Sequence, residues 1–551
     1  MTTVQGTPQS RSFEKTASPP LGLCPDWLRL GQAAFIAAIA ILLLLPVWIV
    51  RYPPLVDYPN HLARYYVLAH LQDPNLHLSQ FYASRWQASP YVALDVLAVF
   101  LQKLLPLDIV GRLILSISLL SLPLACYVFL RQVDYDSRYL AAWALVISYG
   151  PLFLGGGVND VLSTALCFWL LALCLKYLAK PDWKLWLGLL ILATLLYFTH
   201  LFGFAMGAMI VFIYCVLTRQ NVRRLFAATS IFVPGVVIYL LAFFRGRSYW
   251  LKEENPAYRY QIDVAEKLVL LSNPFRGYGP KSTTLVLIAL ISCLIVAVWR
   301  NREFRLNHVW LWVTTATFVV YLLLPPNFHL MDWRILPFLF ILSLSVAKVG
   351  PRARVLGAIG LLMFVVRSFE VDRTFTSRQH QLAEWHRSFE AIPRYSRVFP
   401  IVRLEDEGYN RAYMHFWAYG VIERGWFSPN MFHSIGIHPL ALDTPADDIA
   451  RLLWKKDPGH SGWWYVPEPD WPEIQRRFDY LWVFDLPRFS EPISKFGELA
   501  YSDGPVRVFR VRPISPPDSG PTTSHEPNQK DLKTSLKTPP TRTYGAKMVP
   551  Q

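Results

Sequence analysis

The chain has 551 residues, of which 53% are hydrophobic, 15% are aromatic and only 17% are charged. Soluble proteins usually carry about 25% charged residues, so this composition excludes an ordinary soluble domain and predicts a membrane protein. A net charge of +15 is compatible with a nucleic-acid partner. However, the Lys and Arg residues fall in short clusters between apolar runs, as in cytoplasmic loops, so we expect no nucleic-acid binding.

The first 367 residues read as a tail followed by repeated membrane crossings. Residues 1–30 are polar and predict a disordered cytoplasmic tail. Apolar runs between residues 31 and 367 predict an all-α polytopic membrane domain with about eleven transmembrane helices, interrupted by long polar loops at 51–108 and 245–282. The expected crossings are Gly31–Val50, Ile109–Leu130, Tyr139–Leu154, Val161–Leu178, Leu185–Phe198, Phe202–Leu217, Leu225–Phe244, Thr283–Trp299, Val309–Leu324, Ile335–Val349 and Val355–Val366.

Amphipathic stretches occur within both long loops. In the first loop they span Asn60–Leu71 and Val92–Leu105, and in the second loop Ile262–Leu271. Each is a candidate for a helix that lies on the membrane surface.

Residues 368–513 have a different composition, because polar, Pro-rich segments alternate there with short β-like runs. Strands are expected at Arg397–Val402, Trp463–Val466, Tyr480–Phe484 and Val506–Val511, and helices at Gln379–Ala391 and Trp471–Phe478. This alternation predicts a small α/β domain. Residues 514–551, rich in Pro, Ser, Thr and Lys, predict a second disordered tail.

Basic residues predict the orientation. Five alternate loops carry them: Arg131 and Arg138; Lys176, Lys180 and Lys184; Arg219, Arg223 and Arg224; Arg300, Arg302 and Arg305; and Lys348, Arg352 and Arg354. All five lie on one side if the N-terminus is cytoplasmic. The loops 51–108 and 245–282 and the α/β domain are then extracytoplasmic.

A candidate catalytic motif follows the first crossing directly, at residues 57–64. Pro59 suits a helix start, so Asp57 is expected just before a short helix that carries His61 and Arg64 on one face. A carboxylate at this place can take a proton from an acceptor hydroxyl or hold a divalent cation. The alternative is that Asp57 caps the helix and Arg64 anchors at lipid headgroups.

A second candidate lies between the third and fourth crossings. Three glycines at 155–157 allow a tight turn and a close backbone approach, and Asn159 and Asp160 follow them on the outer side. The alternative is a re-entry turn with a helix cap. This is no nucleotide-binding glycine motif, because no strand precedes it.

Two further candidates flank later crossings. His200 lies at the outer end of the fifth crossing, where a hydrogen-bonded structural histidine is the alternative. Arg334 lies at the outer start of the tenth crossing, where a guanidinium can clamp a lipid-linked phosphate by paired hydrogen bonds. Its alternatives are contact with headgroups or a pair with Asp332.

Two acidic motifs are not expected to be catalytic. Asp134 and Asp136 have the spacing by which soluble sugar transferases hold a metal and a nucleotide sugar. The basic-residue pattern puts them in a short cytoplasmic loop with no room for a nucleotide-binding fold. Residues 405–407, Glu-Asp-Glu, read as a solvated loop.

The order of these features resembles the GT-C class of polytopic glycosyltransferases. Residues 56–64 resemble the motif that bacterial members carry after the first helix, and residues 157–159 and 334–337 resemble weaker recurrent features. The likeness covers residues 30–370. It implies a polyprenyl-phosphate sugar donor, an inverting transfer on the non-cytoplasmic side, and Asp57 as base or metal ligand.

The first loop departs from part of this class. Several branches have paired acidic residues there, whereas Tyr58 follows Asp57 in this chain. This departure favours a metal-free base, with a divalent cation (Mg or Mn) as the alternative.

We therefore expect a glycosyltransferase of the bacterial inner membrane. A hexosyl or pentosyl group would move from a polyprenyl phosphate to a hydroxyl of a glycan, lipid or protein. Asp57 would activate the acceptor, and Arg334, with His61 or Arg64, would bind the donor phosphate. The other expected substrate-binding residues are Asn159, Asp160 and His200.

Two alternatives stay open at this point. A flippase or transporter of lipid-linked saccharides predicts charged residues buried mid-helix and repeated halves. A non-enzymatic membrane protein with an outer binding domain predicts that residues 368–513 alone retain binding and that Asp57 is dispensable.

Overall fold

The structure is a computed structural model that describes residues 26–244, 264–299, 301–324, 331–402, 412–433, 437–442, 469–485 and 489–513. The tail 514–551 and most of the tail 1–30 lie outside the described residues, as does the first half of the loop 245–282. The acidic motif 405–407 and the predicted strand 463–466 also lie outside them.

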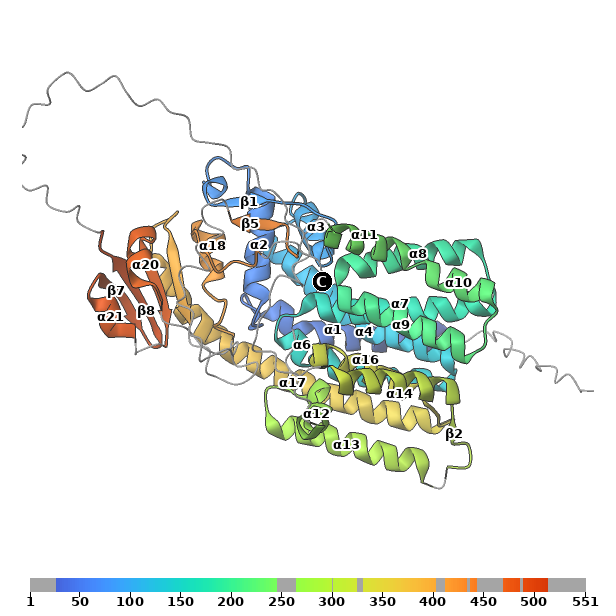
Figure 1. The fold of residues 1–551 in the computed structure, drawn as a ribbon. Coiled ribbons are helices and arrows are strands. Elements are labelled where there is room, and N and C mark those ends of the chain that lie inside the picture. Colours follow the sequence, from blue (N-terminus) through green and yellow to red (C-terminus); the bar gives the residue numbers. More distant parts are fainter. Residues whose placement is uncertain are drawn as a thin grey trace, which may run out of the picture. The chain divides into compact units, whose positions relative to one another are not determined.

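Helices make up most of the described chain (Figure 1). The α-helices are α1 (Asp26–Ile49), α2 (Tyr58–His70), α3 (Val92–Leu101), α4 (Leu107–Val133), α5 (Ala142–Ser148), α6 (Pro151–Leu154), α7 (Val158–Ala179), α8 (Trp183–Thr199), α9 (Leu201–Leu217), α10 (Val222–Ser230), α11 (Val233–Phe244), α12 (Val264–Leu270), α13 (Pro280–Val298), α14 (His308–Leu323), α15 (Met331–Arg334), α16 (Leu336–Leu344), α17 (Arg352–His386), α18 (Ala418–Arg424), α20 (Trp471–Arg477) and α21 (Ser490–Ser494). Short 3₁₀ helices are η1 (Leu78–Gln80), η2 (Asp136–Ala141), η4 (Asn273–Phe275) and η5 (Arg387–Ala391).

Each predicted crossing coincides with at least one of these helices. Among the described residues, α1, α4, α7 and α13 are long and apolar enough to span a membrane, and α10 with α11, bent by 53°, can form a fifth span. The protein is therefore a multi-pass membrane protein. The number of eleven crossings stays a prediction, because several of the other apolar helices are shorter than an average span.

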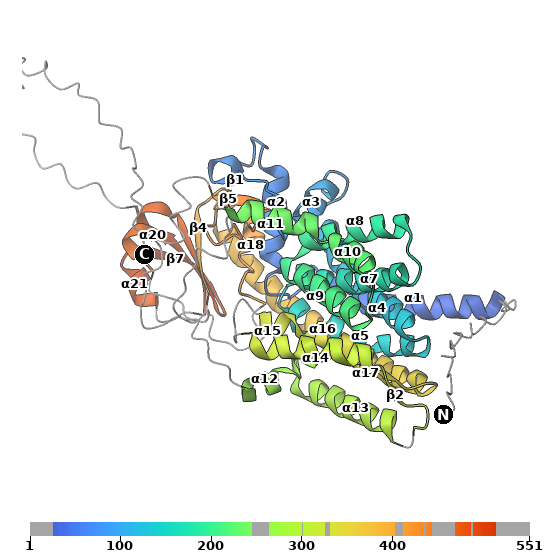
Figure 2. The ribbon, with the colours of Figure 1, turned by 45° about the vertical axis from the view of Figure 1, so that its right-hand side comes forward.

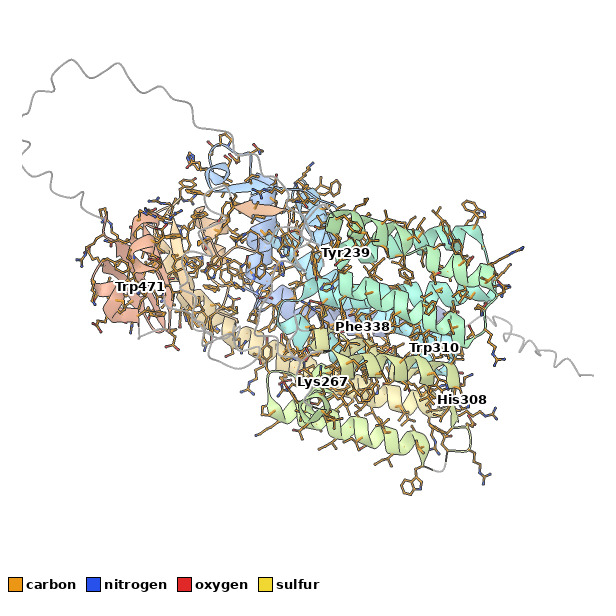
Figure 3. The ribbon with its side chains drawn as sticks, in the orientation of Figure 1. Tyr239, Lys267, His308, Trp310, Phe338 and Trp471 are labelled. Atoms are coloured by element: carbon orange, nitrogen blue, oxygen red, sulfur yellow. The ribbon has the colours of Figure 1, made fainter. Side chains whose placement is uncertain are left out.

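The apolar helices pack side by side. In Figures 1 and 2, α7 lies beside α8 and α9, and α4 packs along α7. Buried aromatic rings join α14 and α16 to this group: Trp310 lies 5.0 Å from Phe129, and Phe338 lies 6.0 Å from Phe168, between ring centroids (Figure 3). Such ring pairs stabilise helix contacts beyond their buried area.

The strands are β1 (Tyr82–Ser84), β2 (Arg305–Leu306), β3 (Ala347–Lys348), β4 (Val398–Val402), β5 (Leu440–Leu442), β6 (Tyr480–Phe484), β7 (Gly497–Asp503) and β8 (Val506–Val511). Four of them form one sheet in the order β4-β6-β8-β7, in which only the β4–β6 pair is parallel. β4, β6 and β8 agree with predicted strands. β7 was not expected, because this edge strand is mostly exposed and its Gly, Glu, Ser and Asp residues have low strand propensity.

Residues 412–433 and 437–442 return to the first long loop. β5 pairs with β1, placing Leu440 opposite Ser84, and α18 packs against α2. The Tyr82 hydroxyl donates to the Ser428 carbonyl at 3.1 Å and accepts from the Ser428 amide at 2.9 Å. α17 also runs unbroken through residue 367, where the membrane domain was expected to end, and residues up to Arg512 form one compact unit.

α2 is a buried helix. Nine of its 13 residues are buried, and it packs against α3, α4 and α18. The sequence predicts that Asn60–Leu71 lies on the membrane surface. This prediction is wrong for α2, because α18, about 350 residues later in the chain, packs against it. For α3 the interpretation stays a prediction, since Val96 and Phe100 are exposed.

Candidate active site

Asp57 immediately precedes α2, as predicted. It occupies the N-cap position, yet its side chain makes no capping hydrogen bond, and only its backbone carbonyl accepts from His61 N–H, at 3.1 Å. The Asp57 side chain is 39% exposed. Its carboxylate is therefore not used for helix capping, which was the structural alternative.

The glycine turn holds Asp57 in place. The Asp57 amide donates to the Gly155 carbonyl at 3.1 Å. Gly156 has φ +87°, and a Cβ there would lie 2.6 Å from the Asp57 nitrogen. Only glycine fits such a close backbone approach without strain. The turn at 155–157 therefore supports the first candidate motif and also begins α7, which carries the second.

Asp160, His200 and Arg334 converge although they come from three segments. Asp160 Oδ1 lies 2.9 Å from His200 Nε2 and 2.8 Å from Arg334 Nε. His200 caps α9, with Nδ1 accepting from Phe202 N–H at 3.1 Å. Because Nδ1 is the acceptor, the neutral ring carries its proton on Nε2, which faces Asp160. His200 thus fills the structural role foreseen as its alternative and contacts the site as well.

The charge of Arg334 is stabilised by its neighbours. Burial alone would lower the pKa of the guanidinium, but the charge of Asp160, then Tyr91 and Asp57, raises the pKa above its usual value. Asp57 and Asp160 therefore act on the same cation. Asp332, the expected alternative partner of Arg334, lies 3.5 Å from the fully buried Lys267 (labelled in Figure 3).

Arg64 forms a buried ion pair. Its Nε donates to Asp95 Oδ1 at 2.7 Å and its Nη2 to Asp95 Oδ2 at 3.3 Å, and both side chains are completely buried. This arrangement is neither a headgroup anchor nor an exposed phosphate ligand. It fastens α2 to α3, and removing one partner would leave a buried charge uncompensated.

His61 lies beside this ion pair. Burial and then the charge of Arg64 hold the pKa of His61 well below its usual value, so the imidazole is neutral. Its buried Nδ1 has no hydrogen-bond partner among the described residues. Asn159 is buried in the first turn of α7, next to Asp160. The substrate-binding roles of His61 and Asn159 stay predictions.

Three site residues were not found from the sequence: His415, Asn60 and Tyr91. His415 Nε2 lies 3.3 Å from Asp57 Oδ1, and His415 also contacts Asn60. The Tyr91 ring lies 4.4 Å from the His200 ring, and Tyr91 has the unusual φ of +83°. No local signal marks His415, because it is 358 positions from Asp57 and belongs to no periodic segment.

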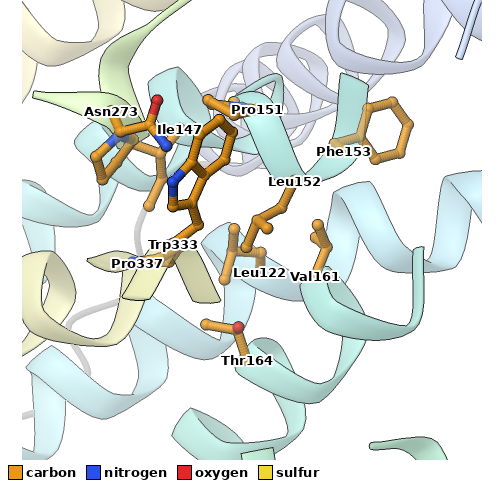
Figure 4. A pocket seen from close by; sticks show the side chains of 12 residues that line it. Leu122, Ile147, Pro151, Leu152, Phe153, Val161, Thr164, Asn273, Trp333 and Pro337 are labelled. Atoms are coloured by element: carbon orange, nitrogen blue, oxygen red, sulfur yellow. The ribbon is translucent and has the colours of Figure 1, made fainter. Parts of the chain in front are cut away.

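A narrow, mostly apolar pocket is lined in part by sequence neighbours of Asp160 and Arg334 (Figure 4). Val161 and Thr164 line it from α7, just after Asp160, and Trp333 and Pro337 line it on either side of Arg334 in the sequence. Apolar side chains dominate the lining.

The described residues contain no group of three or more His, Cys, Asp or Glu side chains placed to hold a metal ion. The divalent cation therefore stays an alternative for experiment. Asp134 belongs to the acidic motif that was not expected to be catalytic. Its carboxylate accepts hydrogen bonds from the amide and hydroxyl of Ser137, which is a local structural role.

Comparison with known proteins supports the fold. No protein-family model matches the chain, and no curated protein matches it by sequence. The crystal structure of ArnT from Cupriavidus metallidurans bound to undecaprenyl phosphate is similar with a TM-score of 0.53 at 11% identity, covering 88% of this chain and 98% of that one. The apo structure of the same protein gives 0.52 at 12% identity, with coverage of 88% and 97%.

A third structure, arabinofuranosyltransferase AftD from Mycobacteria, aligns with a TM-score of 0.44 at 14% identity, covering 89% of this chain and 42% of that one, and we base no argument on it. The similarity to ArnT extends over most of both chains. At the level of the fold, it confirms the GT-C resemblance predicted from the sequence.

Proposed function

We propose that the protein is a membrane glycosyltransferase that moves a sugar from a polyprenyl phosphate to a hydroxyl of a glycan, lipid or protein. One observation carries this proposal: the glycine turn that binds the Asp57 amide also begins α7, whose Asp160 lies 2.8 Å from Arg334, so that a carboxylate and a cation far apart in the sequence are held at the same end of one helix. The similarity to a protein crystallised with undecaprenyl phosphate supports a lipid-phosphate donor.

The chemistry requires a base and a cation on opposite sides of the reacting carbon. Asp57 takes the proton of the acceptor hydroxyl while that oxygen bonds to the anomeric carbon of the sugar. The bond between this carbon and the phosphate oxygen breaks, and the electron pair leaves with the polyprenyl phosphate. Arg334 stabilises the negative charge that develops on the leaving phosphate. Attack from the opposite face inverts the anomeric configuration.

Asp160 and His200 orient the cation. The carboxylate of Asp160 lies 2.8 Å from Nε of Arg334 and attracts the guanidinium to this position. His200, fastened to the start of α9, fixes Asp160 in turn. A cation held in this way needs no reorganisation when charge develops on the phosphate, which is the main source of electrostatic catalysis.

The assay that tests this function follows both products. Purified protein in lipid is incubated with a mixture of polyprenyl-phosphate sugars extracted from bacterial membranes and with candidate acceptors. We expect time-dependent release of polyprenyl phosphate and a glycosylated acceptor, at a rate unchanged by a chelator of divalent cations. Transport of intact donor across the bilayer without release would favour a flippase instead.

We further propose the orientation predicted from the basic loops, in the bacterial inner membrane with the N-terminus cytoplasmic. A cysteine at Asn75, exposed in the first long loop, should react with a membrane-impermeant maleimide from the periplasmic side. A cysteine at the exposed Tyr135 should react only after the membrane is opened. Both are placed in a variant without Cys24. The reverse pattern would put Asp57 in the cytosol and contradict the proposed function.

A further inference from the structure

A histidine from the C-terminal part of the chain contacts the proposed base. His415 belongs to the described segment 412–433, and its Nε2 lies 3.3 Å from Asp57 Oδ1. The His415 side chain is only 11% exposed, whereas that of Asp57 is 39% exposed. The imidazole therefore approaches the carboxylate from the protein side and leaves part of the carboxylate accessible.

Asn60 determines which nitrogen of His415 carries the proton. The Phe432 amide donates to Asn60 Oδ1 at 2.9 Å, so Nδ2 must be the atom that faces the other way. This Nδ2 donates to the Asn430 carbonyl at 3.0 Å and lies 3.3 Å from His415 Nδ1. Because an N–H group points at Nδ1, the neutral imidazole carries its proton on Nε2, directed at Asp57.

This arrangement excludes His415 as the base itself. Both of its ring nitrogens are occupied, one by Asn60 and the other by Asp57. A histidine that acted on the acceptor would need one nitrogen directed at the substrate. The carboxylate has two oxygens, and the oxygen 3.3 Å from His415 is Oδ1.

We propose that His415 is a positioning residue: its Nε2–H holds one oxygen of Asp57 so that the other oxygen faces the acceptor hydroxyl. The inference rests on the proposed function, in which Asp57 is the base. It gives the C-terminal segment a part in the reaction that the sequence did not reveal.

The segment that carries His415 is itself fixed to α2. Asn60 is completely buried and joins α2 to the backbone of residues 430 and 432. The Phe432 ring packs 5.1 Å from the His415 ring and 5.0 Å from the His61 ring. His415 is thus held at both its ring face and its Nδ1, as a residue that orients another must be.

The groups around Asp57 come from several elements. His415 approaches from segment 412–433, Arg334 acts on it from α15, and His61 lies one turn further along α2. Asp160 acts on Arg334 and His61 from α7. Among these groups of the described residues, His415 is the one that lies at hydrogen-bonding distance from the Asp57 carboxylate.

The test compares two amides that differ by one methylene. In His415→Gln the amide nitrogen reaches the position of Nε2 and can still donate to Asp57, whereas in His415→Asn it reaches only the position of Nδ1. We expect His415→Asn to lower the transfer rate about 100-fold, the usual effect of a misplaced reactive group. His415→Gln should retain most of the rate.

The split between kcat and KM separates positioning from general loss of structure. Without its donor the Asp57 carboxylate is misplaced toward the acceptor hydroxyl, so kcat per folded molecule should fall in His415→Asn while KM for the donor stays unchanged, and both should stay near the wild type in His415→Gln. A merely structural role would lower the amount of folded protein and leave kcat per folded molecule unchanged. Asp57→Asn with His415→Asn should be no slower than Asp57→Asn alone.

Two results would overturn the inference while the proposed function survives. One is a His415→Asn enzyme with the wild-type kcat and KM beside an inactive Asp57→Asn enzyme. The other is equal impairment of kcat per folded molecule in His415→Asn and His415→Gln. An Asp57→Asn enzyme that works at the wild-type rate would instead remove the proposed function, and this inference with it.

Discussion

Replacing Asp57 by Asn is expected to lower the transfer rate about 1,000-fold while donor binding stays close to that of the wild type. A positioned general base contributes about 10² to 10⁴ to a rate, and an amide cannot take the proton. The substitution preserves shape, and the Asp57 side chain makes no capping hydrogen bond whose loss would unfold α2. The measurement is the single-turnover rate with bound donor.

Asp73→Asn is the matched control, because Asp73 lies in the same predicted outer loop and its side chain accepts hydrogen bonds from its neighbour Asn75, away from the proposed site. It should leave the rate unchanged. An Asp57→Asn protein with the wild-type rate at equal folding would show that Asp57 is not the base.

Replacing Arg334 by Gln is expected to weaken donor binding about 100-fold. A hydrogen bond to a charged group contributes up to about 3 kcal/mol, which corresponds to a factor of about 100 in the dissociation constant. The loss also leaves the carboxylate of Asp160, now 2.8 Å from Arg334 Nε, without that cation in a buried site. The measurement is the affinity for a polyprenyl phosphate without a sugar.

Two controls sharpen this prediction. Arg334→Lys keeps the charge but lacks the planar fork, so its affinity should fall between those of the wild type and the Gln variant. Arg276→Gln removes an exposed Arg from the same predicted outer side and should bind normally. Wild-type affinity in Arg334→Gln would place the phosphate elsewhere.

The sequence predicted those features that depend on neighbours in the chain. The length of the apolar runs predicted the helices α1, α4 and α7, and Pro59 predicted the start of α2 directly after Asp57. The glycines at 155–157 predicted that another backbone segment approaches closely, but they did not identify this segment as Asp57. Each of these rests on a local physical rule.

The other features of the site depend on contacts between residues that are far apart in the sequence. Arg64 was expected to bind the substrate, but it is buried in an ion pair with Asp95, which lies on another helix, α3. His415 comes from a segment that was expected to form a separate domain. No period or spacing in one sequence encodes such pairs, because they arise only when distant helices pack.

The two alternative functions fit the structure less well. An independent outer binding domain would need its own boundary, whereas α17 continues through residue 367 and segment 412–433 is bonded to α2. A transporter path needs charged groups along the helices. The ion-paired carboxylates Asp160 and Asp95 instead lie in the first turns of α7 and α3.

The most direct test is a structure of the Asp57→Asn protein bound to a polyprenyl-phosphate sugar, in which the substituted enzyme preserves the donor. The account predicts the phosphate within hydrogen-bonding distance of the Arg334 guanidinium, and the sugar between that phosphate and residue 57. A phosphate bound away from Arg334, or a residue 57 that faces lipid instead of the sugar, would contradict it.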